Sequence, residues 1–87
     1  MTTPRNSAAV RRATNIAISA YGSRACVQAY KMNLVDGHGA STIGFTLGLT
    51  TRQADAAIRA GQNITLLAWE AGLTPIGLHE YLRTITL

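Results

Sequence analysis

Cysteine is nearly absent from this sequence of 87 residues, in which Cys26 stands alone. A lone cysteine excludes a disulfide within the chain and suits a reducing compartment. The two histidines, His38 and His79, lie far from Cys26 and from each other along the sequence, so the close ligand pairs that zinc sites use are missing. We therefore expect neither a metal nor another cofactor in this chain.

Acidic residues are also scarce. The sequence has only four Asp and Glu, and none are paired at a spacing that suits acid–base chemistry. It also has no glycine loop followed by Lys and Ser or Thr, the pattern that binds nucleotide phosphates. We therefore expect no enzymatic activity.

Long hydrophobic runs are missing as well. No run approaches the roughly 18 apolar residues that a membrane span needs. Arg5, Arg11 and Arg12 are followed by Asn15 and Ser19, which interrupt any apolar run of a secretory signal. The expected location is the bacterial cytoplasm, with no membrane partner.

The chain is short for a stable core. With 47% hydrophobic residues it should form one small domain, and domains of this size bury only about 60% of the surface of the unfolded chain. Because neither a disulfide nor a metal is expected, self-association is the expected way to complete the core.

Positive charge is in excess and lies toward the N-terminus. Eight Lys and Arg against four Asp and Glu give a net charge of +4. Residues 1–36 carry five of the basic side chains and one acidic one, whereas residues 61–87 carry one basic and two acidic ones. This asymmetry favours an anionic partner, of which nucleic acid is the commonest for a soluble chain.

Glycine divides the sequence, at positions 22, 37, 39, 48, 61 and 72, into segments with helical spacing of apolar residues. The expected fold class is all-α, a small bundle of five to six short helices. Ser23 is expected to cap the second helix. In the first helix, the stripe expected to face the core consists of Ala9, Ala13, Ile16, Ala17 and Ala20.

The middle of the chain matches the helix-turn-helix template. Gly44 supplies the small residue at which two helices cross closely, and Gly48 supplies the left-handed φ that the turn requires. Thr50 and Gln53 form a capping box that starts the second helix, and Gly61 is expected to end it. Apolar residues fill the inner positions of both helices: Ile43, Leu47, Leu49, Ala54, Ala57 and Ile58.

A second, similar pattern follows the first. The order glycine, leucine, threonine recurs 24 residues later, at positions 72–74, with Gln62 or Asn63 and Thr74-Pro75 as helix starts. The expected single domain therefore has three parts: basic N-terminal helices over 1–39, the helix-turn-helix over 40–61, and a C-terminal helix-turn-helix-like hairpin over 62–87.

The first hairpin has more side chains suited to reading bases than the second, which has few donors and stays open as the reading unit. A recognition helix places its N-terminal residues in the major groove, where Arg bonds guanine and Gln or Asn bonds adenine. The later hairpin offers Ile76 and the carboxylate of Glu80, which phosphates repel. Base reading is therefore assigned to Thr50, Thr51, Arg52, Gln53 and Asp55. Phosphate contacts, which position a protein on DNA, are assigned to Arg5, Arg11, Arg12, Lys31 and Arg59.

Large apolar residues concentrate in the C-terminal hairpin, where Trp69 and Tyr81 suit the centre of an interface. One recognition helix contacts too few bases for useful specificity, so we expect a homodimer on an inverted repeat in double-stranded DNA. The residues assigned to the dimer interface are Leu66, Trp69, Leu78, Tyr81, Leu82 and Ile85.

A different function class stays open. A glycine between two amphipathic helices also occurs in plain helical hairpins, and the chain would then be an adaptor or antitoxin-like subunit that binds another protein through its apolar C-terminal third. The position of positive charge discriminates between the two. An adaptor gains nothing from Arg52, Gln53 and Arg59 on the exposed side of a helix-turn-helix.

In length, basic character and the central segment GFTLGLTTRQADAAIRA, the chain resembles the KorC group of small plasmid-encoded transcriptional repressors. The resemblance implies a dimeric repressor that binds palindromic operators at plasmid promoters and controls plasmid maintenance operons. It also implies a base-reading role for the segment from Thr50 to Asp55. Apart from the resemblance, a co-repressor protein stays open as a further partner. The small size of the chain favours repression, because it leaves no room for an effector domain.

Overall fold

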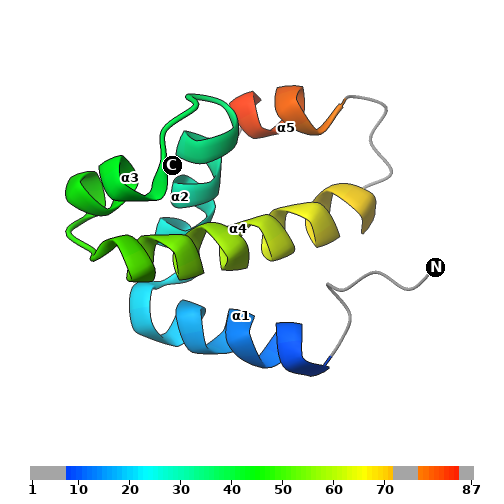
Figure 1. The fold of residues 1–87 in the computed structure, drawn as a ribbon. Coiled ribbons are helices and arrows are strands. Elements are labelled where there is room, and N and C mark those ends of the chain that lie inside the picture. The colour runs from blue at the N-terminus through cyan, green and yellow to red at the C-terminus, as the bar shows by residue number, and fades with distance from the viewer. Residues whose placement is uncertain (1–7, 72–76, 85–87) are drawn as a thin grey trace.

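Five α-helices make up the part of the chain that the computed structural model describes, residues 8–71 and 77–84 (Figure 1). No strand occurs in these residues, which confirms the expected all-α class. Arg5, Ile85 and the turn expected at 72–74 lie outside them. The helices are α1 (Ala8–Tyr21), α2 (Ser23–Leu34), α3 (Ala40–Leu47), α4 (Thr51–Ala71) and α5 (Leu78–Thr84).

The longest helix, α4, has 21 residues and spans about 31 Å. All four other helices contact it. In Figure 1, α4 crosses the middle of the molecule, and α1 runs antiparallel to it along one side. The position of each of the other helices is therefore determined mainly by its contacts with α4.

Small side chains dominate the core around α4. Its buried cluster consists of Ala17, Cys26, Ala29, Ile43, Ala54, Ala57 and Ala60. Small side chains let helices approach closely, but each one removes little apolar area from water. Desolvation by burial raises the pKa of the Cys26 thiol, so this side chain acts as a small hydrophobic residue at neutral pH.

The sequence predicts that Gly61 ends the second helix of the helix-turn-helix. This prediction is wrong, because α4 continues through Gly61 to Ala71. A Cβ at position 61 would collide with the backbone carbonyl oxygen of Cys26 and lie 3.0 Å from Cβ of Tyr30. Gly61 is therefore needed for the close approach of α2 and α4. The predicted boundary between 40–61 and 62–87 falls inside one continuous helix.

The face that α1 turns to the core also differs from the predicted stripe, of which only Ala17 is buried. Ile16 is 63% exposed, whereas Thr14 is buried. The reason is a hydrogen bond between α1 and α4, in which Nδ2 of Asn63 donates to Oγ1 of Thr14 at 2.9 Å. This bond lets a threonine occupy a buried position that the pattern reserves for an apolar residue.

Leu82 is completely buried within the single chain, so its assignment to a dimer surface is wrong. The physical reason is that α5 contacts both α2 and α4 and uses an apolar side chain to pack there. Leu66, Trp69, Leu78 and Tyr81 are each half-buried. Among the described large apolar residues of the C-terminal third, Leu82 thus belongs to the core and Leu67 is exposed. No helix in the described residues is long and apolar enough to cross a membrane.

The contact between α2 and α4 gives a first prediction. Gly61→Ala should lower the free energy of unfolding by about 3 kcal/mol or more, because the added methyl group meets backbone that cannot rotate away. Urea unfolding followed by circular dichroism measures the change. Gly39→Ala is the control, since a Cβ there meets no atom within 4 Å, and it should cost less than about 1 kcal/mol. Equal costs for the two variants would contradict the assigned role of Gly61.

Candidate nucleic-acid interface

The turn between α3 and α4 begins at Gly48, which adopts the left-handed conformation with φ of 74°. Beyond it, the backbone N–H of Leu49 donates to the carbonyl of Gly44 at 2.7 Å. This bond satisfies a carbonyl at the end of α3 in the manner of a Schellman motif. The predicted role of Gly48 as the turn residue is confirmed.

Gly44 allows α3 and the start of α4 to lie close together. A Cβ at position 44 would be 2.6 Å from the carbonyl oxygen of Leu49 and 3.2 Å from that of Thr50. The neighbouring Ile43 is completely buried, as are Ala54 and Ala57 of α4. The close crossing expected at Gly44 is therefore present, and apolar packing beside it holds the two helices together.

The predicted capping box starts α4. The backbone N–H of Thr50 donates to Oε1 of Gln53 at 2.9 Å, and the backbone N–H of Gln53 donates to Oγ1 of Thr50 at 3.1 Å. These bonds satisfy two donors that a helix N-terminus otherwise leaves without partners. In the cap, the amide oxygen of Gln53 and the hydroxyl oxygen of Thr50 both act as acceptors.

All five residues assigned to base reading are exposed, whereas Ala54 between them is buried. Arg52, Asp55 and Arg59 follow at intervals of three and four residues and so share one face of α4. Oδ2 of Asp55 lies 3.1 Å from Nε of Arg59, with the two side chains 52% and 78% exposed. A pair this exposed adds little stability. Its main effect is to place a balanced charge pair one turn beyond Arg52.

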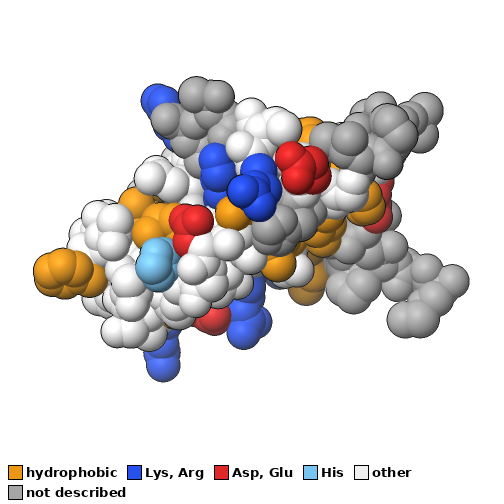
Figure 2. Space-filling view, turned by 90° about the horizontal axis from the view of Figure 1, so that it is seen from above, with side chains coloured by type: hydrophobic (Ala, Val, Ile, Leu, Met, Phe, Trp, Pro, Cys, Tyr) orange, Lys and Arg blue, Asp and Glu red, His pale blue; other side chains and the backbone are white. Residues whose placement is uncertain are grey.

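Of the described residues assigned to phosphate contacts, only Arg59 lies on α4 with this helix start. Arg11 and Arg12 lie near the beginning of α1. The other end of α1 lies beside the start of α4 (Figure 1), about 14 Å along the helix from these two arginines. Lys31 is half-buried in the last turn of α2, where a positive charge complements the helix dipole. In Figure 2 the basic side chains likewise occupy several separate places on the visible face.

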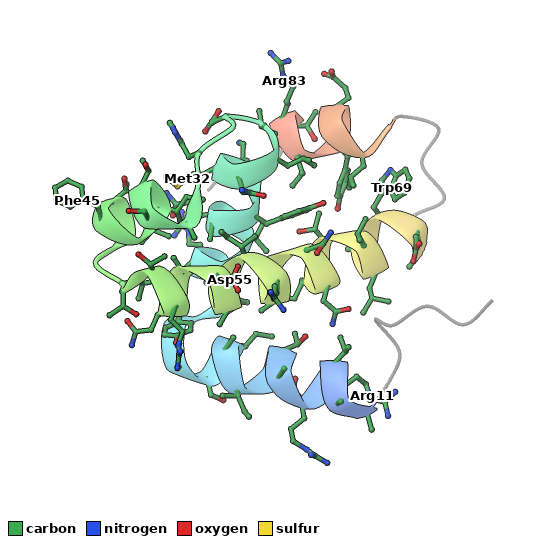
Figure 3. The ribbon with its side chains drawn as sticks, in the orientation of Figure 1. Arg11, Met32, Phe45, Asp55, Trp69 and Arg83 are labelled. Carbon is green, nitrogen blue, oxygen red and sulfur yellow. The ribbon has the colours of Figure 1, made fainter. Side chains whose placement is uncertain are left out.

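Two exposed residues near the helix-turn-helix were not assigned from the sequence. Arg24 is exposed in the first turn of α2, at the corner that follows α1. Phe45 on α3 is 91% exposed and points away from α4 (Figure 3). The exposure of Phe45 could be predicted from helical spacing, because a helix that turns Ile43 and Gly44 inward directs Phe45 to the solvent.

Among residues 8–71 and 77–84, no three His, Cys, Asp or Glu side chains lie close enough to hold a metal ion. Comparison of the chain with protein-family models, with curated proteins and with solved structures finds no match. The candidate site is therefore the start of α4, which exposes hydrogen-bond donors and acceptors and is held by the Gly48 turn and the cap between Thr50 and Gln53.

The capping box gives a second prediction. Thr50→Ala should lower the free energy of unfolding by about 1 kcal/mol, because the N–H of Gln53 loses its acceptor. Thr51→Ala removes the same hydroxyl and methyl from the next residue, which takes no part in the cap, and should cost less than about 0.5 kcal/mol. Chemical denaturation of both variants tests this, and a larger cost for Thr51→Ala would exclude the proposed cap.

Proposed function

We propose that this chain is a sequence-specific DNA-binding protein that represses transcription as a homodimer on an inverted-repeat operator in double-stranded DNA. The observation that carries the proposal is the exposed polar start of α4, held by the Gly48 turn and by the bonds between Thr50 and Gln53. A start fixed before binding reduces the entropy lost on contact with DNA. The net charge of +4 supports an anionic partner.

Within this start, Arg52 is the principal base reader. Its guanidinium matches O6 and N7 of guanine, which accept two parallel hydrogen bonds in the major groove. Asp55 can accept from the amino group of cytosine, and the Thr51 methyl group suits the methyl group of thymine. Thr50 and Gln53 also position the helix, because the cap uses the hydroxyl oxygen of Thr50 and the amide oxygen of Gln53 as acceptors.

Phosphate contacts are expected closest to this start. Arg59 shares the helix face of Arg52, and Arg24 lies at the α1–α2 corner. Arg11 and Arg12 reach DNA only where it extends along α1. A bound dimer represses by excluding polymerase from a promoter that overlaps the operator. The resemblance to KorC-type repressors adds plasmid maintenance operons as the regulated genes.

The protein-interaction alternative receives less support. It depends on a free apolar surface in the C-terminal third, and of the large apolar side chains described there only Leu67 is exposed, whereas Leu82 is completely buried and Trp69 and Tyr81 are half-buried. The residues that distinguish the two functions, Arg52 and Gln53, are exposed.

Selection of random duplex DNA by the purified protein tests the proposal. At about 150 mM salt, where nonspecific phosphate attraction is weakened, we expect recovery of an inverted repeat. Recovery of no sequence above background would contradict DNA reading and favour the protein-interaction alternative.

On the selected site, Arg52→Ala should weaken binding by about 1–3 kcal/mol and relax base preference at one position of each half-site. The physical reason is the loss of a bidentate contact that only one base offers. Arg12→Ala removes the same charge away from the helix start and should weaken cognate and random DNA alike. Electrophoretic mobility shift titrations on both DNAs measure this, and an equal loss on both for Arg52→Ala would rule out base reading by Arg52.

Asp55→Asn should strengthen binding to random DNA several-fold, because it removes a negative charge and releases Arg59 toward phosphate. The slope of log K against log salt should steepen by about 0.9, the value for one added phosphate contact. Asp36→Asn changes the net charge equally outside α4, and the salt slope should then stay unchanged. A slope that shifts equally in both variants would show that only net charge matters.

A further inference from the structure

A buried oxygen between α1 and α4 lacks a hydrogen-bond partner among the described residues. The side chain of Asn63 joins the two helices, because its Nδ2 donates to Oγ1 of Thr14 at 2.9 Å. Asn63 is only 5% exposed, and its Oδ1 is buried and accepts no hydrogen bond from any described residue. Buried side-chain oxygens in folded proteins nearly always have a partner. A donor that does not belong to the described residues is therefore expected at Oδ1 of Asn63.

Asn63 lines a groove of about 340 Å³ between α1 and α4. Sites for small molecules have volumes of about 300–1,000 Å³ and combine an apolar lining with a few polar groups. Here Ile18 of α1 and Ile64 and Leu67 of α4 supply the apolar lining. Leu67 is exposed and the two isoleucines are half-buried, so a ligand in the groove covers apolar surface that the chain leaves partly in contact with water. The volume suits a molecule with a single ring.

The polar side chains of the groove define the chemistry of its ligand. Arg11 is the only charged residue among the described residues that line it, and it lies in the first half of α1, beside the second half of α4 (Figure 3). A guanidinium has five N–H donors, so Arg11 can bind a carboxylate in addition to any other bond that it makes. An amide oxygen only accepts, so Asn63 requires a hydroxyl or another donor. The ligand is therefore an anion with an apolar body and a donor group.

We propose that the groove between α1 and α4 binds a small aromatic carboxylic acid that carries a hydroxyl group. The hydroxyl donates to Oδ1 of Asn63, the ring packs on Leu67, and the carboxylate faces Arg11. Because Oδ1 is shielded from solvent, the exposed side chains of Arg11 and Asn15 move as the ligand enters. The site does not depend on DNA reading, since Asn63 lies about 17 Å along α4 from Arg52.

Titration of the isotope-labelled protein with 4-hydroxyphenylacetate tests the site. In two-dimensional NMR spectra we expect saturable shifts of the backbone signals of Ile18 and Leu67 and of the side-chain amide of Asn63. The dissociation constant should be on the order of 1 mM, which is typical of a ligand with about 11 non-hydrogen atoms. Phenylacetate lacks only the hydroxyl and should bind about tenfold more weakly. Equal affinities for the two acids, or shifts confined to residues outside the groove, would overturn the proposal.

Two variants assign the hydroxyl contact to Asn63. Asn63→Leu removes the acceptor, so it should bind both acids with equal affinity. Thr65→Val is the matched control, because Oγ1 of Thr65 is also buried and unpaired but Thr65 does not line the groove, and this variant should keep the preference for the hydroxyl. A preference that persists in Asn63→Leu would overturn the proposal. If Asn63→Leu does not fold, the comparison of the two acids on the wild-type chain decides.

The carboxylate contact has its own test. The neutral 4-hydroxyphenylacetamide should bind the wild-type chain several-fold more weakly than the acid, and Arg11→Gln, a change at an exposed position, should abolish this difference. A difference that persists in Arg11→Gln would contradict the contact with Arg11. These titrations contain no DNA, so failure to bind the acid leaves the proposed function intact, and failure to select a DNA sequence leaves this site intact.

Discussion

The close contact between α2 and α4 at Gly61 is the constraint on which the rest of the structure depends. Here one helix passes over the carbonyl of Cys26 without a side chain between them. A glycine inside a helix costs about 1 kcal/mol of helix propensity, and the packing of Ala29 and Ala57 in the same core offsets that cost. Because α1, α3 and α5 also contact α4, this contact fixes the rotation of α4 and hence the direction in which Arg52 points.

The start of the candidate interface could be predicted from the sequence because its determinants are local. Gly48 acts through its own φ, and Thr50 and Gln53 bond to each other across three residues. Such interactions need no knowledge of which distant segment lies nearby, so residue type and spacing are enough to identify them. The all-α fold follows for the same reason, because helical periodicity is itself a local property.

The long-range contacts could not be predicted in this way. Gly61 has the residue type of a helix end, and only the presence of Cys26 beside it reveals a packing role. Thr14 has a polar side chain, and only Asn63, 49 residues away, explains why it is buried in place of Ile16. In each case the deciding partner comes from another part of the chain, and a periodic pattern contains no information on that partner. The residues expected to contact phosphate lie apart from one another for the same reason, since the direction of α1 relative to α4 depends on tertiary packing.

The scattered positive charge has a consequence for a protein that reads DNA as proposed. Among the described residues, few cations surround the start of α4, and Asp55 holds Arg59 in an ion pair, so one copy gains little from nonspecific phosphate attraction. Discrimination depends on the ratio of specific to nonspecific affinity, and weak nonspecific attraction raises that ratio. The absolute affinity must then come from joining two reading helices, because the second one binds at the high effective concentration that the first creates. In the proposed homodimer, joining the two helices supplies that gain without adding charge that would bind all sequences equally.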